Sequence, residues 1–587
     1  MRSLFLAACI AAASPVYAQY FEHHYGTTTF DVGHHGMYTT MTAPLPQPAG
    51  LVISGIMQTP TAPLNRLMVS RTDNNGNVFG APYFNRIYNI TIPGAPALSV
   101  NDAKVIELPN NLGFAVAGSC TQNATGLEFI YYLRLTPNGN PINPVFYYST
   151  GDQRFRLHGV RLATAGNAVY LVGDAATPAA NLQRFFILKV GIPGNMLWGS
   201  TYVSPIGQFF ESAYDVVEDP SSVPMANLVC VVGTTRNTNG NTDAFFLQVN
   251  PNTGAPLPPG IMNIYGTPNS YDHFYSIDRS NDAMPAPPMT QFGYVIGGYS
   301  NAGNAAGVND SWVIRMDNTL VTGWSRLIDY GNGGINNECR DVVESFNPTI
   351  LQYEYYAGGN TANGFQGGPD MELNKLDRFG NLMWQGTYGD QGNQRLAAID
   401  EVPANTTAGI NNISLYGNTQ PGLVGGQDLC IFNVNSNGQT ACDFKVHGAP
   451  FTFGPDLYNR KEFLVRAPFT VTQGTFNFTT YQDVQKCFVQ AFPVITPKSA
   501  DAPAIQLDVY GTGESAMTLE VNGAASAPAE LMVTDITGRI LYQGQVMLQE
   551  GTTYLPVDLS GQLSSGIYMV TLRQGAVVTT TKVMIAK

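Results

Sequence analysis

The sequence is poor in charge, in clustered cations and in long helical patterns. Charged residues make up 12% of the 587 residues, and no cluster of Lys and Arg occurs. The net charge of -13 and the pI near 5.0 therefore oppose binding to nucleic acid or to an anionic membrane surface, because neutralising phosphate needs clustered cations. Beyond the N-terminus, no apolar run approaches the ~18 residues of a membrane-spanning helix, so we expect no transmembrane segment in the mature chain.

Known catalytic and metal-binding motifs are absent as well. We find no GxSxG elbow, phosphate loop, HExxH or Ser-x-Asp-x-Gly-x-x-Trp box. The seven cysteines are too few for a disulfide scaffold and show no zinc spacing. Cys430 and Cys442 flank the turn 435–438 almost symmetrically, which favours a single bridge across one hairpin. We assign no catalytic, cofactor-binding or metal residues.

The N-terminus carries an export signal. Residues 1–18 combine Arg2, an apolar run from Leu4 to Ala13 and small residues before a cut after Ala18, which is typical of a signal peptide. The stretch Leu6 to Cys9 also fits a lipoprotein processing box, although cleavage there would leave almost no apolar segment upstream. We therefore expect the protein to be exported.

The composition predicts an all-β protein. The chain has 61 Gly, 38 Pro and 11% aromatic residues, with much Asn, Thr and Val, which indicates many short strands joined by turns. One hairpin, Asp370 to Gly389, shows this clearly. Met371, Leu373 and Lys375 alternate along its first strand, so we expect one buried face.

Relatives of this hairpin recur along the chain, each preceded by an apolar strand that ends in glycine. The glycines that end these strands are Gly55, Gly118, Gly173, Gly233, Gly297, Gly358 and Gly417, at steps of 55 to 64 residues. A further short strand precedes each of them, so a unit holds four strands. Four antiparallel strands repeated seven times predict a β-propeller.

The ends of the repeat region suggest how the ring closes. Tyr20 to Gly26 resembles the fourth strand of a unit, so we expect it to complete the last blade and to remove an exposed edge. Residues 449–492 contain further strand-like pieces and form a closing or degenerate blade. The interpretation is a seven-bladed propeller over residues 19–492, with eight blades as the alternative.

A composition change at 493–504, rich in Pro, Ala and other small residues, marks a linker. Residues 505–587 then read as a small immunoglobulin-like β-sandwich. This segment contains four motifs in order: VTDITGR (533–539), DLS (558–560), GIYMV (566–570) and the closing KVMIAK (582–587). On these motifs it resembles the type A C-terminal sorting domain of the type IX secretion system of Bacteroidota.

The resemblance implies how the protein travels. Cargo of this kind crosses the inner membrane by its signal peptide, passes through the periplasm, and crosses the outer membrane through the secretion machinery, which recognises the C-terminal domain. The implied location is the cell surface or the medium, and the implied partner is that machinery. The segment Lys375 to Trp384 also resembles repeats that accompany such domains, without fixing an activity.

Acidic residues near the starts of the units are the candidates for chemistry. Asp215, Asp341, Asp400 and Glu107 occupy roughly equivalent first-strand places, as do Glu218 and Glu344. A ring of acids could bind a cation or act as a general acid and base, but repeated residues usually serve the repeat. A second series, Asp243, Asp310, Asp370 and Asp428, begins the third strands, where we favour turn capping over calcium binding.

Histidines and tryptophans give weaker signals. In the pairs His23-His24 and His34-His35, neighbours on a strand face opposite sides, so at most one of each pair faces a given site. His158, His273 and His447 are isolated. Trp198, Trp324 and Trp384 recur on fourth strands, where packing between blades is favoured over a sugar-stacking platform.

The sequence is compatible with three functions. The first is a secreted or surface propeller that binds a protein or glycan ligand through loops such as Thr234 to Thr242 and Ser300 to Asn309. The second is a secreted hydrolase or lyase acting on polysaccharide with first-strand acids. The third is a structural or adhesive spacer. Burial of the carboxylates of Asp215, Asp341 and Asp400 in backbone hydrogen bonds would count against the enzyme.

Overall fold

The computed structural model divides the chain into two compact units, Met1–Phe492 and Pro493–Lys587. Its described residues contain strands and turns and no helix, so the all-β prediction is confirmed. The residues outside the description are 1–21, 26–29, 42–48, 60–61, 79–81, 91–97, 150–153, 178–181, 204–209, 220–227, 237–238, 258–260, 268, 283–292, 303–306, 329–335, 363–367, 390–391, 403–410, 421–425, 441–443, 448–451, 454–457, 464, 469–471, 477–480, 484–505, 511–515, 525–526, 536–538, 550, 559–565, 575–576 and 586–587. The expected signal peptide and linker fall there.

The described part of the first unit contains seven antiparallel sheets, which we number in chain order. Sheet 1 holds β2 (Asp31–Thr39), β3 (Gly50–Thr59), β4 (Ala62–Asp73) and β5 (Phe84–Tyr88). Sheet 2 holds β6 (Leu98–Val100), β7 (Lys104–Leu108), β8 (Gly113–Gln122), β9 (Leu127–Leu135) and β10 (Pro141–Ser149). Sheet 3 holds β11 (Arg154–Leu162), β12 (Ala168–Thr177), β13 (Leu182–Gly191) and β14 (Met196–Val203).

The other four sheets repeat this plan. Sheet 4 holds β15 (Ser212–Asp219), β16 (Leu228–Arg236), β17 (Thr242–Val249) and β18 (Ile261–Gly266), and sheet 5 holds β19 (Asp272–Ser280), β20 (Gly293–Ser300), β21 (Asp310–Asp317) and β22 (Thr322–Ile328). Sheet 6 holds β23 (Asn337–Asn347), β24 (Gln352–Thr361), β25 (Asp370–Leu376) and β26 (Leu382–Tyr388). Sheet 7 holds β27 (Asn393–Val402), β28 (Asn412–Gln420), β29 (Asp428–Val434) and β1 (Glu22–Tyr25).

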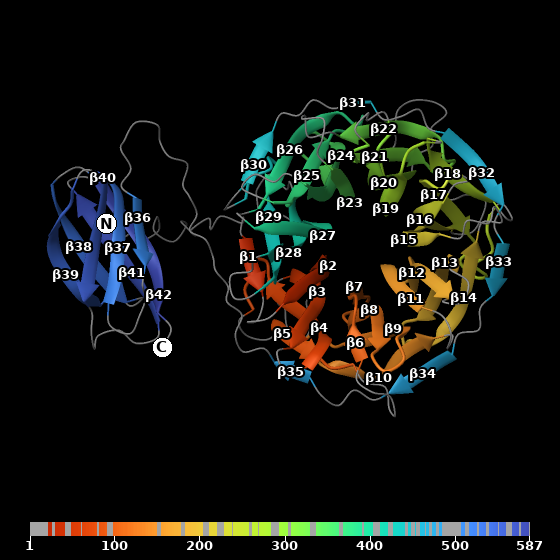
Figure 1. Ribbon diagram of the computed structural model, residues 1–587, viewed down its shortest axis with the longest axis horizontal. Helices are drawn as coiled ribbons and strands as arrows, with labels where there is room; N and C mark the ends of the chain where they lie inside the picture. Colours follow the sequence, from red (N-terminus) through yellow and green to blue (C-terminus); the bar gives the residue numbers. More distant parts are fainter. Residues whose placement is uncertain are drawn as a thin grey trace, which may run out of the picture. The chain divides into compact units, whose positions relative to one another are not determined.

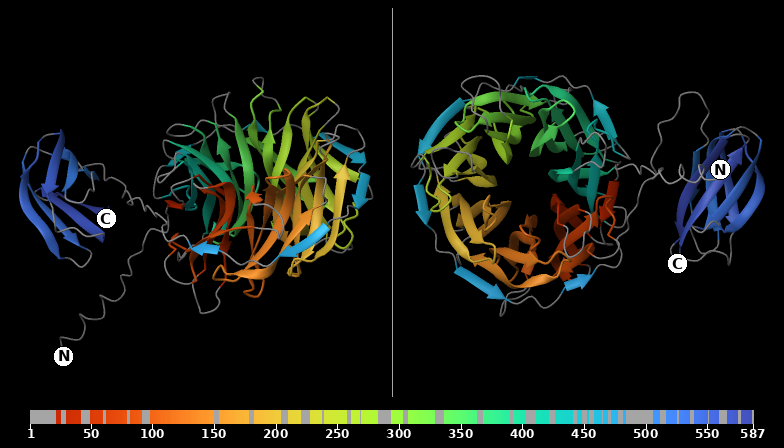
Figure 2. Two further views of the ribbon diagram at one scale, coloured as in Figure 1. Left: turned by 60° about the horizontal axis from the view of Figure 1, so that its bottom comes forward. Right: turned by 180° about the vertical axis from the view of Figure 1, so that it is seen from behind.

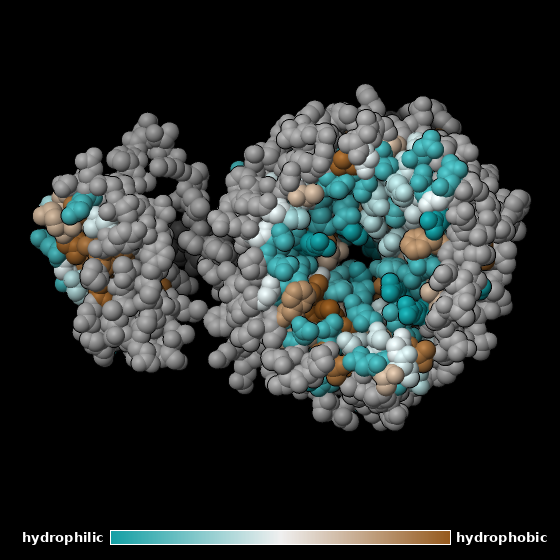
Figure 3. All heavy atoms as spheres, in the orientation of Figure 1, coloured by the Kyte–Doolittle hydropathy of each residue, from teal (hydrophilic) through white to brown (hydrophobic). Residues whose placement is uncertain are grey.

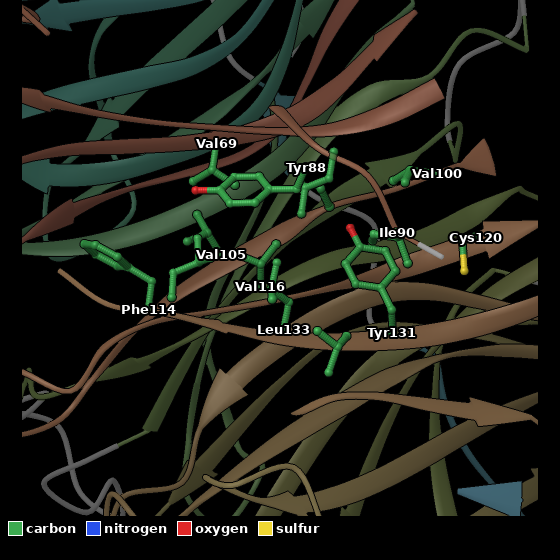
Figure 4. Close-up of a cluster of buried hydrophobic side chains, with 14 of the residues drawn as sticks. Val69, Tyr88, Ile90, Val100, Val105, Phe114, Val116, Cys120, Tyr131 and Leu133 are labelled. Atoms are coloured by element: carbon green, nitrogen blue, oxygen red, sulfur yellow. The ribbon is translucent and has the colours of Figure 1, made fainter. Parts of the chain in front are cut away.

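The seven sheets follow one another around a central opening, with β2, β7, β11, β15, β19, β23 and β27 innermost (Figures 1 and 2). Adjacent sheets pack face to face on apolar side chains. Figure 4 shows one such layer, in which Val69 and Tyr88 of sheet 1 lie near Val105, Val116 and other side chains of sheet 2. Burying this apolar surface from water is the main stabilising term.

Packing on both faces corrects the alternation expected for the hairpin at Asp370. All seven residues of β25 are buried, including Lys375, because sheets 5 and 7 cover its two faces. The turn between β25 and β26 has Gly380 at φ 75°, and Asp377 Oδ1 accepts hydrogen bonds from the amides of Phe379 and Asn381 at 2.8 Å. The turn is therefore held by its own aspartate.

The N-terminal strand belongs to the last sheet. β1 pairs antiparallel with β29, with Tyr25 opposite Leu429. Tyr25 is fully buried, and its apolar neighbours come from sheets 1 and 7. Sheet 7 thus combines the N-terminal strand with three strands from residues 393–434.

The segment expected as a closing or degenerate blade has a different structure. Its strands form no sheet of their own within the described residues. Each of them, and the preceding strand β30, is added as one further strand to the outer edge of another sheet. We call this segment, residues 444–483, the belt. It comprises β30 (Phe444–His447) on β26, β31 (Thr452–Phe453) on β22, β32 (Tyr458–Phe463) on β18, β33 (Val465–Pro468) on β14, β34 (Thr472–Phe476) on β10 and β35 (Tyr481–Asp483) on β5.

The belt therefore runs along sheets 6, 5, 4, 3, 2 and 1, the reverse of their order in the chain. Its strands lie outside the strand that would otherwise be the outer edge of each sheet (Figures 1 and 2). Its pairing is antiparallel throughout, with six residue pairs between β18 and β32. Of the pieces expected to form an extra blade, CFVQAF (487–492) lies outside the described residues. The physical reason for the difference is that six open edge strands offer more backbone pairing than one short extra sheet.

The second unit contains two sheets. One has the order β36 (Gln506–Tyr510), β37 (Ala516–Ala524), β40 (Gly551–Asp558), and the other has β39 (Ile540–Met547), β38 (Pro528–Asp535), β41 (Gly566–Gln574), β42 (Val577–Ile585). The two sheets share one apolar core, which includes Leu519, Leu531, Val557 and Val570. The motif residues 533–535, 566–570 and 582–585 lie on the neighbouring strands β38, β41 and β42.

Candidate functional site

A β-bulge interrupts the innermost strand of six sheets. The register against the second strand skips one residue in each case, namely His34, His158, Tyr214, Tyr275, Arg340 and Ala397. A bulge leaves its extra residue unpaired and re-aims its side chain. It thus supplies each sheet with one residue that need not follow the alternation of the strand.

The repeated glycine of the second strand makes room for the bulge. The residue opposite is Gly55, Gly173, Gly233, Gly298, Gly359 or Gly417. At each of them an added Cβ would lie closer to a first-strand carbonyl oxygen than van der Waals contact allows, as at Gly359 against Glu338. The glycine period seen in the sequence therefore marks this bulge at four of its positions, while in sheets 5 and 6 the glycine opposite the bulge is the residue after the predicted Gly297 and Gly358. The seventh predicted glycine, Gly118, lies in sheet 2, where the pairing of β7 with β8 has no register shift.

Four consecutive sheets place large polar or aromatic side chains at the bulge. His158, Tyr214, Tyr275 and Arg340 come from sheets 3, 4, 5 and 6, and we call these four residues the bulge array. The ring centroids of His158 and Tyr214 are 4.9 Å apart, as are those of Tyr214 and Tyr275, and Arg340 lies over the Tyr275 ring at 4.2 Å. The array was not predicted from the sequence, although the residue before the repeated acids Asp215 and Asp341 marks two of its members.

The bulge array lines a central cavity of about 330 Å³. All seven innermost strands contribute to its wall, which also includes Lys104, Arg161, Asp215, Asp341 and Asp400. Figure 3 shows hydrophilic residues gathered around this opening. The cavity is therefore polar, and aromatic on the side of the bulge array.

Asp215 and Asp341 directly follow their bulges and link neighbouring sheets. Asp215 accepts hydrogen bonds from the amides of Val216 (2.8 Å) and of Ile277 in the next sheet (3.0 Å). Asp341 accepts from the amides of Val342 (3.0 Å) and of Ile399 in the next sheet (2.9 Å). Both carboxylates are thus occupied by backbone donors.

Asp400 makes the same kind of link from another position. Its carboxylate accepts hydrogen bonds from the amides of Glu401 (2.9 Å) and of Tyr38 in sheet 1 (2.6 Å), so it joins sheet 7 to sheet 1. Asp400 lies three residues after its bulge residue, Ala397, whereas Asp341 directly follows its own bulge residue. The residue of sheet 5 at the same place as Asp400 is Asp278, which was not among the acids singled out in the sequence. The expected equivalence of Asp400 with Asp215 and Asp341 is wrong, because the bulge shifts the alternation.

The glutamates form a third series. Glu107 accepts from the amide of Thr40 (2.9 Å), Glu218 from that of Thr164 (2.6 Å) and Glu344 from that of Asn281 (2.7 Å). In each case the donor belongs to the preceding sheet. Glu107 therefore belongs with Glu218 and Glu344 and not with Asp215, which corrects the sequence grouping.

Burial changes the protonation of several groups in the cavity. It raises the pKa of Asp341 to about 6 and that of Asp400 to about 7. Burial, together with the charges of Lys104 and Arg161, lowers the pKa of His35 to about 3. Burial alone would lower the pKa of Arg161, but the nearby carboxylates, first that of Asp215, outweigh it and raise the pKa.

The histidine pairs are separated in the structure. His34 Nδ1 lies 2.5 Å from Asp102 Oδ1, His35 lines the cavity, and His23 is buried on β1. His158 Nε2 lies 2.5 Å from Asp174, and His273 is hydrogen-bonded to Thr234 and Thr242, both at 2.8 Å. In the described ranges, no group of three or more His, Cys, Asp or Glu is arranged to hold a metal ion.

The recurring tryptophans pack between sheets, as their strand position predicted. Trp198, Trp324 and Trp384 donate from Nε1 to carbonyls in the β-turn of the following sheet, those of Pro251 (2.9 Å), Arg378 (3.0 Å) and Ser436 (3.0 Å). Lys189 and Lys375 donate to the same carbonyls as Trp198 and Trp384. This convergence explains why Lys and Trp recur together in the repeat.

Two further expectations remain predictions. Asp243, Asp310, Asp370 and Asp428 are buried at the starts of the third strands, where turn capping was expected. Cys430 is buried in sheet 7, but Cys442 lies outside the described residues, so the bridge between them is untested. Parts of the loops Thr234 to Thr242 and Ser300 to Asn309 also lie outside. Within the described residues, no helix is long and apolar enough to cross a membrane.

Comparisons with known proteins identify the second unit. A family model described as a secretion system C-terminal sorting domain matches residues 514–586. No curated protein matches the chain. Among solved structures, a tetra-tandem repeat from the extending region of a large adhesion protein is similar at 12% identity and a TM-score of 0.13, covering 94% of this chain and 99% of that one.

A second solved structure is PorZ, a surface component of the type IX secretion system of Porphyromonas gingivalis. It is similar at 9% identity and a TM-score of 0.18, covering 94% of this chain and 81% of that one. At these TM-scores neither structure bears on the arrangement of the sheets. The sorting domain does bear on the route of the protein: with residues 514–586 in the secretion system C-terminal sorting domain family, the chain is a cargo of the type IX secretion system, exported to the cell surface or secreted.

Proposed function

We propose that the first unit is a closed seven-bladed β-propeller that works as a binding module outside the cell, and that the second unit is an immunoglobulin-like sandwich. Closure is supported by the links between sheets 7 and 1. Asp400 accepts the Tyr38 amide, and Tyr25 donates to the Gly76 carbonyl at 2.6 Å. A shared apolar core, which includes Leu51 and Leu429, packs between the same two sheets.

The observation that carries the binding role is the bulge array. Positions that hold the sheets together carry the same residue type in more than one sheet. Asp215 and Asp341, for example, both accept hydrogen bonds from backbone amides. The bulge positions do not share one residue type, since they hold histidine, tyrosine, arginine or alanine. Bulge positions that carry aromatic rings and a cation and that line a polar cavity are suited to a recognition surface.

The hydrolase alternative receives less support. A general acid or base must reach the proton that it transfers. The carboxylates of Asp215, Asp341 and Asp400 each accept backbone hydrogen bonds from two sheets. That is the arrangement expected if the acids hold the sheets together.

A direct binding comparison tests the proposal. The exported chain is applied to immobilised extracellular-matrix proteins, mucin and a glycan array, beside the variant His158→Ala/Tyr214→Ala/Tyr275→Ala. We expect binding to at least one surface and at least tenfold weaker binding by the variant. Phe379→Ala, which removes an exposed aromatic residue at the β25–β26 turn, is the matched control. Equal binding by all three proteins, or binding to no surface, would overturn the proposal.

A further inference from the structure

The aromatic side of the cavity extends beyond the bulge array. Tyr299 on β20 lies beside Tyr275, with ring centroids 5.7 Å apart, and His273 stacks on Tyr299 at 4.4 Å. The rings of Tyr214 and Tyr275 meet edge to face at 83°. Tyr214, Tyr275 and Tyr299 are all half-buried. Tyr214 and Tyr275 line the cavity, and Tyr299 of the same sheet as Tyr275 packs beside it without being sealed in the core.

A polar groove of about 230 Å³ adjoins this surface through one ion pair. Glu338 lines the groove and lies 2.7 Å from Arg340, which lines the cavity and covers Tyr275. The groove takes most of its lining from uncharged polar residues: Asn309, Asn336, Asn337, Asn360 and Thr361. Aromatic rings and side-chain amides are thus placed next to each other.

One amide in the groove is unused. Asn337 is fully buried and lines the groove, yet neither its side-chain oxygen nor its nitrogen has a hydrogen-bond partner among the described residues. A buried amide without partners costs free energy unless something satisfies it. It offers one acceptor and two donors, which suits a group that both donates and accepts.

The charges in this region compensate one another. Arg340 is paired with Glu338, and His158 with Asp174 at 2.5 Å. Arg161 lies 3.5 Å from Asp215 and donates to the Ile277 carbonyl. The described linings of the cavity and the groove together contain four cations, among them Arg395 in the groove, and five carboxylates. No net positive charge therefore attracts an anionic group, in contrast to the arginine pairs of phosphate or carboxylate sites. The chemistry favours a ligand without net charge.

We propose that the three tyrosines and the amide groove form a binding site for a neutral oligosaccharide. The inference rests on the binding role proposed for the first unit and names its ligand class. A sugar ring presents an apolar face that packs on an aromatic ring, while its hydroxyls both donate and accept hydrogen bonds as side-chain amides do. The cavity is at the small end of the range of roughly 300–1,000 Å³ typical of ligand pockets, which suits one sugar residue there and its neighbour in the groove.

The test uses the exported chain on an array of neutral gluco-, galacto-, manno- and N-acetylglucosamine oligosaccharides, with sialylated and uronic acid oligosaccharides on the same surface. We expect at least one neutral series to bind and the acidic ones to bind no better. Tyr275→Ala should raise the Kd at least tenfold. Tyr275→Phe keeps the ring face, so its Kd should stay within about threefold of the wild-type value. Tyr214→Ala is the second variant, and thermal unfolding confirms that each is folded.

Each outcome decides the inference. Binding confined to acidic oligosaccharides, or neutral binding unchanged in both folded alanine variants, would overturn it. The proposed function fails separately. The exported chain could bind a protein such as mucin, the bulge-array variant could fail to bind it, and no oligosaccharide could compete for this binding. That result would support the binding module and overturn the neutral oligosaccharide as its ligand. Phe379→Ala again serves as the control for loss of an exposed aromatic residue.

Discussion

The Tyr25 hydroxyl donates a 2.6 Å hydrogen bond to the Gly76 carbonyl in the β4–β5 turn. The same link recurs between consecutive sheets, since Tyr88 donates to Gly139 (2.7 Å), Tyr148 to Gly194 (2.5 Å), Tyr202 to Gly254 (2.6 Å) and Tyr388 to Gly438 (2.9 Å). In each case a fourth-strand tyrosine reaches the glycine turn of the next sheet. Tyr25 makes this bond from sheet 7 to sheet 1, across the two ends of the repeat region.

If β1 closes the ring, Tyr25→Phe should cost as much as the equivalent change inside it. Removing either hydroxyl leaves a glycine carbonyl without its buried donor, at about 1–3 kcal/mol. We therefore expect Tyr25→Phe and Tyr388→Phe to lower the free energy of unfolding by similar amounts in urea titrations. An N-terminal strand that contributes nothing would leave Tyr25→Phe at wild-type stability while Tyr388→Phe is destabilised.

The belt should protect the outer edges of six sheets. Without residues 444–483, the edge strands β5, β10, β14, β18, β22 and β26 would expose unpaired backbone groups, which promote aggregation. We expect a chain ending at residue 440 to aggregate and to be cleaved by protease faster than one ending at 492. The second chain is the control, because it loses only residues 493–587. Equal protease resistance would show that the belt does not stabilise the first unit.

Much of the repeat could be predicted from sequence because each sheet repeats side-chain patterns. The glycine period marked the second strands and, to within one residue, the bulges of six sheets, and the likeness of Tyr20 to Gly26 to residues 383–389 marked a fourth strand. The belt left no such pattern, since its strands are joined to the sheets by backbone pairing, which is insensitive to side chains. The bulge array was missed for a related reason: one inserted residue shifts the period-two alternation, so Asp400 was aligned with Asp341.

Stability should fall as the pH rises through weak acid. Burial raises the pKa of Asp400 to about 7, above its value of about 3.9 in an unfolded chain. The folded state therefore binds the proton more tightly, and the stabilisation, complete below about pH 4, is lost as the pH approaches 7. We expect the Tm of Asp400→Asn to depend less on pH between about 4 and 8 than that of the wild type.

The control for this measurement is Asp377→Asn, at the exposed β25–β26 turn. It removes a carboxylate of the same kind from a site outside the cavity, and so it shows the effect of losing a carboxylate away from the buried position of Asp400. A wild-type Tm that rises steadily from pH 4 to 7 would contradict the sign. Identical profiles for Asp400→Asn and the wild type would show that another group titrates.

Removing the second unit should stop export. The sorting family covers residues 514–586, so a chain that lacks residues 505–587 should fold its first unit and accumulate in the periplasm. Cell fractionation followed by immunoblotting measures this. Fusing residues 505–587 to a periplasmic reporter is the reciprocal experiment and should carry the reporter to the surface or the medium. Unchanged export of the truncated chain would contradict the assignment.

Gly359→Ala should separate the bulge from the rest of the fold. Its Cβ would collide with the Glu338 carbonyl, so the bulge that carries Arg340 must shift, at about 1–3 kcal/mol for such overpacking. Gly426→Ala is the matched control, because its nearest neighbour would be Phe30 at 3.4 Å. Urea unfolding should show a lower free energy of unfolding for Gly359→Ala alone.

Ligand binding at Tyr275 should weaken in Gly359→Ala as well, because Arg340 lies over that ring and is paired with Glu338. If the variant is destabilised but binds the ligand normally, the bulge stabilises sheet 6 and does not contribute to ligand binding.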